Sequence, residues 1–130
     1  MSTQGCAAVL FAREHQVVAR FYREVAGLRD TGGDADHVRL ASSAFELVVH
    51  QIPERYAKHI VIATPPVVRE MTAIKLCFPC ADLSRARETA ARLGGNLYGT
   101  EREWRSDSAI VCDGYDPEGN VFQLFQPLPT

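Results

Sequence analysis

Apolar residues recur along this chain at two spacings, one typical of helices and the other typical of strands. The first helical segment places five apolar residues on one face and ends at Gly27; they are Val17, Val18, Phe21, Tyr22 and Val25. The second helical segment has Asp82 as its predicted N-cap and ends at Gly94 and Gly95. Its apolar face consists of Leu83, Ala86, Ala90 and Leu93. The pattern therefore predicts two amphipathic helices.

The two helical segments belong to a weak internal repeat. The segments from Glu14 to Gly27 and from Asp82 to Gly95 are equal in length and offset by 68 residues. Short apolar, β-rich segments flank both, which predicts a β-α-β-β-β module twice. The predicted strands of the first module are Cys6–Ala12, Leu28–Thr31, His37–Ala41 and Ala44–His50. Those of the second are Ile74–Pro79, Asn96–Gly99, Ala109–Cys112 and Val121–Gln126.

We expect residues 1–130 to form a single domain of the α+β class. The first module covers about residues 6–51, the second about 73–127, and a proline-rich connector of about residues 52–72 joins them. Within the connector, Glu54–Lys58 favours a short helix and His59–Ala63 favours a strand. A connector this long often covers a binding site or reaches a partner subunit.

The overall charge excludes two classes of partner. With a formal net charge of −2 and a pI near 6.1, the chain has no electrostatic basis for binding nucleic acid or an anionic membrane. No apolar run is long enough to span a bilayer, and residues Met1 to Gly5 lack the features of a signal peptide. The four cysteines are therefore expected to be reduced thiols in the cytoplasm; they are Cys6, Cys77, Cys80 and Cys112.

The segment from Asp113 to Phe125 predicts a strand, a tight turn and a final strand. Pro117 sets the φ angle of a turn's second residue, and Gly119 supplies a left-handed conformation. This hairpin, with its Asp116-Pro117-Glu118-Gly119-Asn120 turn, resembles the closing hairpin of the vicinal oxygen chelate superfamily. That superfamily contains glyoxalases, bleomycin resistance proteins and extradiol dioxygenases. The segment from Phe21 to Leu28 also resembles the end of the family's first helix.

The resemblance implies a fold and an assembly. In the family, two tandem β-α-β-β-β modules form curved mixed sheets around a cavity, and the helices cover the outer faces. Relatives are commonly two-fold dimers, so a homodimer is expected here. The sequence leaves open whether the modules pair within one chain or between two chains.

The resemblance also implies where a metal would bind, on the first and last strands of each module. The corresponding places are Ala7, Glu46, Lys75 and Gln123, where Gln123 replaces the usual metal-binding glutamate. Alanine offers no ligand atom and lysine brings a competing charge, whereas a catalytic divalent ion generally needs about three protein ligands. We therefore expect no metal, and the alternative is a divalent metal involving Glu46 and Gln123.

Strand alternation predicts which side chains face the cavity. In the strand Ile74–Pro79, we expect Ile74, Leu76 and Phe78 to face the helix. The predicted ligand-binding residues are Phe11, Glu46, Val48, His50, Lys75, Cys77, Trp104, Gln123 and Phe125. Lys75 either pairs with Glu46, where it would also bind an acidic ligand group, or lies at a solvated strand edge.

Other candidate residues have two interpretations each. His50 is a hydrogen-bonding or acid–base residue, or has a structural role, while His15 is expected to be solvated. Trp104, in a polar loop, is a lid over the ligand or packs on its own domain. Cys77 and Cys80 match a C-x-x-C spacing, but the first thiol lies inside a strand and the two point to opposite faces, which argues against redox or zinc chemistry.

Three functions are compatible with these residues. The first is a metal-free protein that binds a small organic molecule, as in the bleomycin resistance branch. The second is a metal-dependent lyase or dioxygenase of the same superfamily, resembling glyoxalase. The third is a structural or regulatory dimer with a vestigial cavity. The sequence does not identify the ligand, because this fold hosts several chemistries.

Overall fold

Two compact units make up the chain in the computed structural model, which describes residues 5–130. Unit 1 is Met1–Ile62 and unit 2 is Ala63–Thr130. Residues Met1–Gln4, on which the expected lack of a signal peptide depends, lie outside the described residues. Among residues 5–130, no helix is long and apolar enough to cross a membrane.

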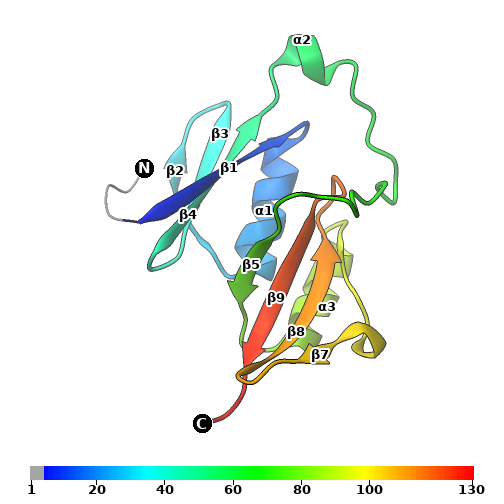
Figure 1. Ribbon diagram of the computed structural model, residues 1–130. Helices are drawn as coiled ribbons and strands as arrows, with labels where there is room; N and C mark the ends of the chain where they lie inside the picture. The colour runs from blue at the N-terminus through cyan, green and yellow to red at the C-terminus, as the bar shows by residue number, and fades with distance from the viewer. Residues whose placement is uncertain (1–4) are drawn as a thin grey trace. The chain divides into compact units, whose positions relative to one another are not determined.

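Unit 1 is a four-stranded mixed sheet with one long helix on one face (Figure 1). Its strand order is β1-β4-β3-β2; β1 and β4 are parallel and the other pairs are antiparallel. The elements are β1 (Cys6–Ala12), α1 (His15–Val25), β2 (Arg29–Gly33), β3 (His37–Ala41), β4 (Phe45–Gln51) and a short α2 (Glu54–Ala57). Leu40, Leu47 and Val49 from the sheet are fully buried with Phe21 and Tyr22 from α1. The predicted β-α-β-β-β module is confirmed.

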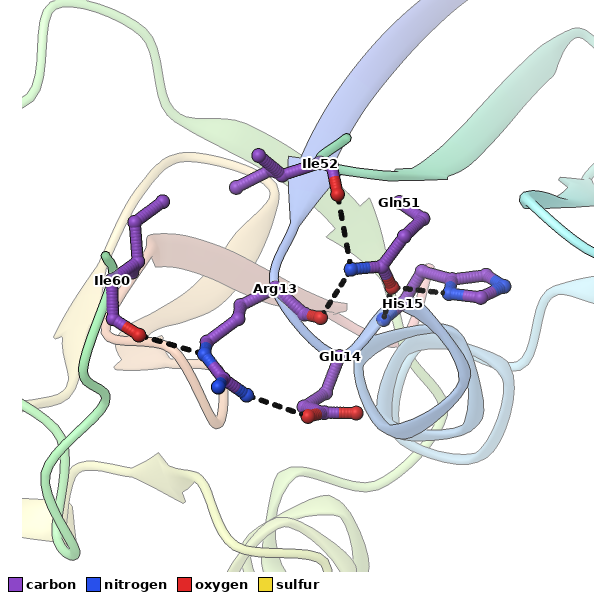
Figure 2. A network of polar contacts seen from close by, with 6 residues as sticks. All are labelled: Arg13, Glu14, His15, Gln51, Ile52 and Ile60. Atoms are coloured by element: carbon purple, nitrogen blue, oxygen red, sulfur yellow. Dashed lines mark hydrogen bonds and ion pairs between the residues drawn. The ribbon is translucent and has the colours of Figure 1, made fainter. Parts of the chain in front are cut away.

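A side chain from the sheet caps the start of α1. Glu14, the N-cap residue, makes no side-chain capping bond. Instead, Gln51 from the end of β4 accepts hydrogen bonds at Oε1 from the backbone N–H and Nδ1 of His15, at 3.3 and 2.6 Å (Figure 2). Its Nε2 donates to the carbonyl oxygens of Arg13 and Ile52. The amide of Gln51 therefore joins the end of β1, the start of α1 and the end of β4.

Two expectations for α1 are wrong. His15 is buried rather than solvated, because the Gln51 amide satisfies its ring nitrogen inside the unit. Val17 is half exposed rather than part of the apolar face. Gly27 ends the helix as predicted, at a φ of 67° in the left-handed region.

Unit 2 repeats the arrangement with a five-stranded sheet. The strand order is β5-β9-β8-β6, and β7 also pairs with β8. The elements are β5 (Leu76–Pro79), α3 (Leu83–Arg92), β6 (Asn96–Leu97), a 3₁₀ turn η1 (Thr100–Arg102), β7 (Trp104–Arg105), β8 (Ala109–Tyr115) and β9 (Val121–Pro127). Helix α3 lies behind β8 and β9 in Figure 1. Asp82 caps α3 as predicted, accepting a hydrogen bond from the N–H of Arg85.

The Asp116–Asn120 turn is held by a buried carboxylate. Asp116 Oδ1 accepts hydrogen bonds from the N–H groups of Glu118 and Asn120, and both of its carboxylate oxygens contact Nδ2 of Asn120. Gly119 has a φ of 86°, as its predicted left-handed position requires. Its carbonyl accepts a hydrogen bond from the N–H of Arg69, so the turn anchors the last part of the connector.

Three predicted details of the connector and unit 2 are wrong. His59–Ala63 is not a strand, because its backbone has no ladder partner in the described part of the chain. Strand β5 begins at Leu76, so Ile74 is exposed and does not face the helix. Trp104 does not lie in a loop, because β7 pairs it with Val111 of β8. The predicted helix at Glu54–Lys58 is confirmed as α2.

Candidate functional site

One face of the sheet in unit 2 carries a row of three polar residues. Asp113 of β8 lies opposite Gln123 of β9, and Gln123 lies opposite Cys77 of β5. Directly opposed residues of neighbouring strands share a face of the sheet. The other face carries Cys112, Leu124 and Phe78, which are buried. The pleat therefore separates a core face from a polar face, as alternation predicted for Cys77 and Phe78.

Asp113 links Lys75 and Gln123 into one hydrogen-bonded chain. Nζ of Lys75 lies 2.9 Å from Oδ2 of Asp113, and Nε2 of Gln123 donates to Oδ1 at 3.0 Å. Because a carboxylate only accepts, the Gln123 amide must turn its NH₂ group toward Asp113. The side chains of Lys75 and Asp113 are both about one-third exposed, at 35% and 34%. The lysine thus supplies a positive charge beside the amide.

The sequence did not identify Asp113 as the partner of Lys75. The predicted strand Ala109–Cys112 ended three residues too early, because β8 continues to Tyr115. Extending the alternation from Val111 by two residues would have placed Asp113 on the same face as Lys75 and Gln123. The pairing of Lys75 with Glu46 stays a prediction.

An open cavity of about 280 Å³ lies beside Asp113. Its lining is mixed, with carboxylates, a guanidinium, a phenol ring and aliphatic side chains. The lining residues are Val68, Glu70, Tyr98, Arg102, Asp113 and Val121. All of them belong to unit 2. Among these lining residues, only Asp113 lies directly opposite a predicted ligand-binding residue, Gln123.

A cation–π contact forms one wall of this cavity. The guanidinium carbon of Arg102 lies 3.7 Å from the centre of the Tyr98 ring. No hydrogen bond or ion pair of the Arg102 guanidinium is found within residues 5–130. Arg102 therefore presents a positive charge, held over an aromatic ring, whose donors have no carboxylate partner in this part of the chain.

Helix α3 fixes the segment that carries Tyr98 and Arg102. Nε of Arg87 donates to the carbonyl oxygen of Tyr98 at 2.7 Å, and Nη2 of Arg87 pairs with Glu103. Burial is the largest single influence on the pKa of Arg87 and lowers it, but the hydrogen bonds and charges of Glu103 and Cys112 together raise this pKa above its ordinary value. Arg87 thus contacts the segment on both sides of Arg102.

The last part of the connector forms the opposite wall. Val68 and Glu70 line the cavity, and the Arg69 N–H bonds to Gly119 between them. A Cβ atom at Gly119 would come within 2.1 Å of the Val67 carbonyl oxygen. Val68 and Glu70 of the predicted connector therefore line this cavity, and the expectation that the connector covers a binding site stays a prediction.

The equivalent face of unit 1 contains other predicted ligand-binding residues. Ala7 lies opposite Glu46, Val9 opposite Val48, and Phe11 opposite His50. Glu46 and Val48 are buried, whereas 57% of Phe11 is exposed. A small cavity of about 50 Å³ touches Glu46 and is too small for an organic ligand.

The remaining predicted residues lie along one row of unit 2. Val111 is opposite both Trp104 and Phe125, and Phe125 is opposite Pro79. Trp104 is 52% exposed and Phe125 is partly buried. These two aromatic side chains therefore share a face with Asp113 and Gln123, one row away.

The side chains at the metal-binding places do not fit a divalent ion. Ala7 lacks a donor atom, Gln123 directs its NH₂ group at Asp113, and Lys75 places an ammonium group in the same network. The residue opposite Gln123 in the ladder is Cys77, two positions after Lys75. Within residues 5–130, no group of three or more His, Cys, Asp and Glu side chains is arranged to hold a metal ion.

The cysteines of unit 2 differ in environment. Burial raises the pKa of the Cys112 thiol, and its hydrogen bond with Arg87 opposes this effect. Burial also raises the pKa of Cys80. Cys77 is exposed and Cys80 is partly buried, and both are free thiols. The expected absence of redox or zinc chemistry at the C-x-x-C spacing stays a prediction.

Comparison with known proteins places the chain in a fold group. The family described as "Glyoxalase-like domain" matches residues 7–125. No curated protein matches the chain. A glyoxalase/bleomycin resistance protein/dioxygenase family enzyme from Burkholderia phytofirmans PsJN has a TM-score of 0.66 at 16% identity, covering 94% of this chain and 97% of that chain.

Two further solved structures have the same fold. The fosfomycin resistance protein FosX from Mesorhizobium loti has a TM-score of 0.60 at 12% identity, covering 98% of this chain and 92% of its own. A bleomycin resistance determinant encoded on the transposon Tn5 has a TM-score of 0.53 at 19% identity, covering 95% and 97%. At these identities the likeness supports the fold alone.

Proposed function

Because the chain belongs to the glyoxalase-like domain family, we propose that it is a metal-free protein that binds a small organic molecule. The ligand site is the cavity of unit 2 together with the adjoining polar face of the sheet. Asp113 belongs to both, since it lines the cavity and bonds to Lys75 and Gln123. We propose that this protein acts in the cytoplasm as a homodimer.

The Lys75–Asp113–Gln123 chain is the observation that carries this proposal. In metal-binding relatives the place of Gln123 normally holds a metal-binding glutamate. Here a neutral amide donates to Asp113, and an ammonium group balances the charge of that carboxylate. A divalent ion at this place would be repelled by Lys75 and would have to displace the amide from Asp113. The face is therefore suited to hydrogen bonding and charge pairing with a ligand.

The cavity indicates the chemistry of the ligand. Its volume of about 280 Å³ is close to the lower end of ligand pockets, roughly 300–1,000 Å³. Val68 and Val121 provide apolar contact, and Tyr98 provides an aromatic surface. Arg102 supplies donors for an acidic or carbonyl group. A small organic molecule with one apolar part and one acidic part matches these side chains.

One observation favours the alternative of a metal-dependent lyase or dioxygenase. Glu46 is a buried carboxylate, 6% exposed, at the predicted metal place of unit 1. In that alternative, Glu46 and Gln123 would bind a divalent metal that polarises vicinal oxygen atoms of a substrate. The charge of Lys75 and the lack of a ligand atom at Ala7 weigh against it.

Ligand screening tests the proposal. Small organic acids with an apolar part would be screened by thermal shift, and each hit would be measured by calorimetry against four proteins. These are the natural chain, Arg102→Gln, Asp113→Asn and the control Arg85→Gln, which changes an exposed arginine on α3. We expect one ligand per chain, with affinity reduced about tenfold or more by Arg102→Gln, which removes a positive charge, and increased by Asp113→Asn, which removes a negative charge beside the acidic group. Binding that neither Arg102→Gln nor Asp113→Asn changes would reject the site.

A further inference from the structure

Two histidines face one another on the sheet of unit 1. His37 of β3 lies directly opposite His50 of β4, so both side chains share the face that also carries Phe11. The ring centres are 5.9 Å apart and the ring planes are within 10°. The Phe11 ring lies 5.6 Å from that of His50 and forms an apolar wall beside it.

The hydrogen bonds of these rings determine which nitrogen carries the proton. Nδ1 of His37 lies 2.8 Å from Oδ1 of Asp34, and Nδ1 of His50 lies 2.8 Å from the carbonyl oxygen of Gln51. Both partners are acceptors, so each Nδ1 carries a hydrogen. In the neutral rings, each Nε2 then has a lone pair. Within the described residues 5–130, neither Nε2 makes a hydrogen bond.

We propose that His37 and His50 bind one divalent transition-metal ion through their Nε2 atoms, with water completing the coordination. Imidazole suits copper, nickel and zinc, and histidines that bind metals usually donate their other N–H to a carboxylate or a backbone carbonyl. Asp34 and the Gln51 carbonyl already fill these two roles. The metal site lies within unit 1 and is built by the register of β3 and β4.

The separation of the rings is close to that of a chelate. With metal–nitrogen bonds of about 2.0–2.1 Å, two imidazoles on one tetrahedral ion have ring centres roughly 5 Å apart. The observed 5.9 Å therefore requires an approach of about 1 Å, which side-chain rotation supplies. Both side chains are partly exposed, so the ion reaches them from solvent.

The site is separate from the metal places of the family. Glu46 lies opposite Ala7 and Ala41, two rows along the sheet from the pair of His37 and His50. With only two protein ligands, the proposed site binds metal reversibly and in the Irving–Williams order, so Cu²⁺ binds more tightly than Ni²⁺ or Zn²⁺, and Mn²⁺ most weakly.

Neighbouring charged groups affect the affinity of the proposed site for a cation. The charged groups near the pair are Asp34, which bonds to His37, and Arg39, which lies on the same face opposite Val48. The negative charge of Asp34 favours binding of the cation, and the positive charge of Arg39 opposes it.

Calorimetric titration of the natural chain with Ni²⁺ or Cu²⁺ alone tests the proposal. We expect one ion per chain, loss of binding in His37→Ala and in His50→Ala, and about tenfold weaker binding in Asp34→Asn. The control His59→Ala changes an exposed histidine of the connector and should bind normally. Circular dichroism would establish that each variant is folded.

A spectroscopic measurement gives an independent result. Electron paramagnetic resonance of one equivalent of Cu²⁺ should show hyperfine coupling to two imidazole nitrogens, and this pattern should be absent in either alanine variant. Undiminished affinity in His37→Ala or His50→Ala would overturn the proposal, as would a Cu²⁺ spectrum without coupling to two imidazole nitrogens. These readouts do not involve Lys75, Asp113 or Arg102, so they are independent of the proposed ligand cavity.

Discussion

The ammonium group of Lys75 lies 2.9 Å from Oδ2 of Asp113, on the sheet face where relatives place metal ligands. The pair is about one-third exposed, so solvent screens it and its direct contribution to stability is small. In the proposed function, the pair sets the charge of the face that adjoins the cavity.

Replacing Lys75 should therefore separate stability from binding. We expect Lys75→Met to change the free energy of unfolding by less than about 1 kcal/mol. It should weaken an acidic ligand about tenfold, because Asp113 would then present an unbalanced negative charge. Chemical denaturation and calorimetry measure the two effects. Lys58→Met, which changes the other lysine of the chain, is the control. Equal ligand affinity in all three proteins would remove Lys75 from the site.

The Gln51 amide should contribute strongly to the stability of unit 1. Gln51→Ala removes four hydrogen bonds and leaves Nδ1 and the backbone N–H of His15 without their Gln51 acceptor. We expect a loss of about 2–3 kcal/mol, within the range for buried polar groups that lose their partners. Gln16→Ala, on the surface of α1, should change the stability little. Urea unfolding would compare the stabilities of the two variants. Similar losses of stability would show that the network in Figure 2 contributes no more than a surface glutamine.

The contact between Gly119 and the connector has a matched control at Gly94. Both glycines have a left-handed φ, 86° and 89°, but only at Gly119 would a Cβ meet backbone, the Val67 carbonyl oxygen at 2.1 Å. Alanine at either position costs about 1–2 kcal/mol for the backbone conformation. We expect Gly119→Ala to cost more than Gly94→Ala and also to weaken ligand binding, since Val68 and Glu70 would shift. Equal effects on both properties would contradict the proposed role of the connector.

The thiols should react at different rates. Cys77 and Cys6 are exposed, whereas Cys112 is buried and its raised pKa keeps it protonated. Burial also raises the pKa of Cys80. We expect iodoacetamide at pH 8 to modify Cys6 and Cys77 first and Cys112 only after unfolding, as mass spectrometry would show. Early modification of Cys112 in the folded protein would contradict its position between α3 and the sheet.

The turn at Asp34 should make stability depend on acid pH. The backbone N–H of Asp36 is the largest cause that lowers the pKa of Asp34, and the hydrogen bond and charge of His37 add to it. A carboxylate whose pKa is lower in the folded chain stabilises above its unfolded pKa, and this contribution is lost as pH falls through the folded value. Asp34→Asn should therefore show less loss of stability below about pH 4 than the natural chain. Identical pH profiles would contradict the assigned hydrogen bonds.

The sequence predicted most of the fold because periodicity and glycine positions act locally. The apolar face with Phe21 and Tyr22, the helix ends at Gly27 and Gly94, and the turn at Gly119 all follow from neighbouring residues. Burial of His15 was missed because its partner, Gln51, is 36 residues away. The β strand at Trp104 was missed because a two-residue strand has no period to detect.

Less of the candidate site could be predicted. Alternation placed Lys75, Cys77 and Gln123 on one face, but it gave no information on Asp113 once the strand was ended at Cys112. Of the cavity residues, Arg102 lies in the 3₁₀ turn η1 and Glu70 in the connector, where no regular spacing links sequence to orientation. Tyr98 lies after the end of β6, which is shorter than the predicted strand Asn96–Gly99. The pairing of His37 with His50 depends on the register between β3 and β4. A hydrophobic pattern determines strand register only where the ends of both strands are predicted correctly.

Metal content tests the central claim of metal-free ligand binding most directly. The His37→Ala/His50→Ala double variant would be used, so that the proposed site on unit 1 does not contribute. After incubation with Ni²⁺, Zn²⁺, Mn²⁺ or Fe²⁺ and removal of the excess, we expect no stoichiometric metal, while the organic ligand still binds. Retention of one ion per chain that is lost on Glu46→Ala would contradict the claim and establish the metal-dependent alternative.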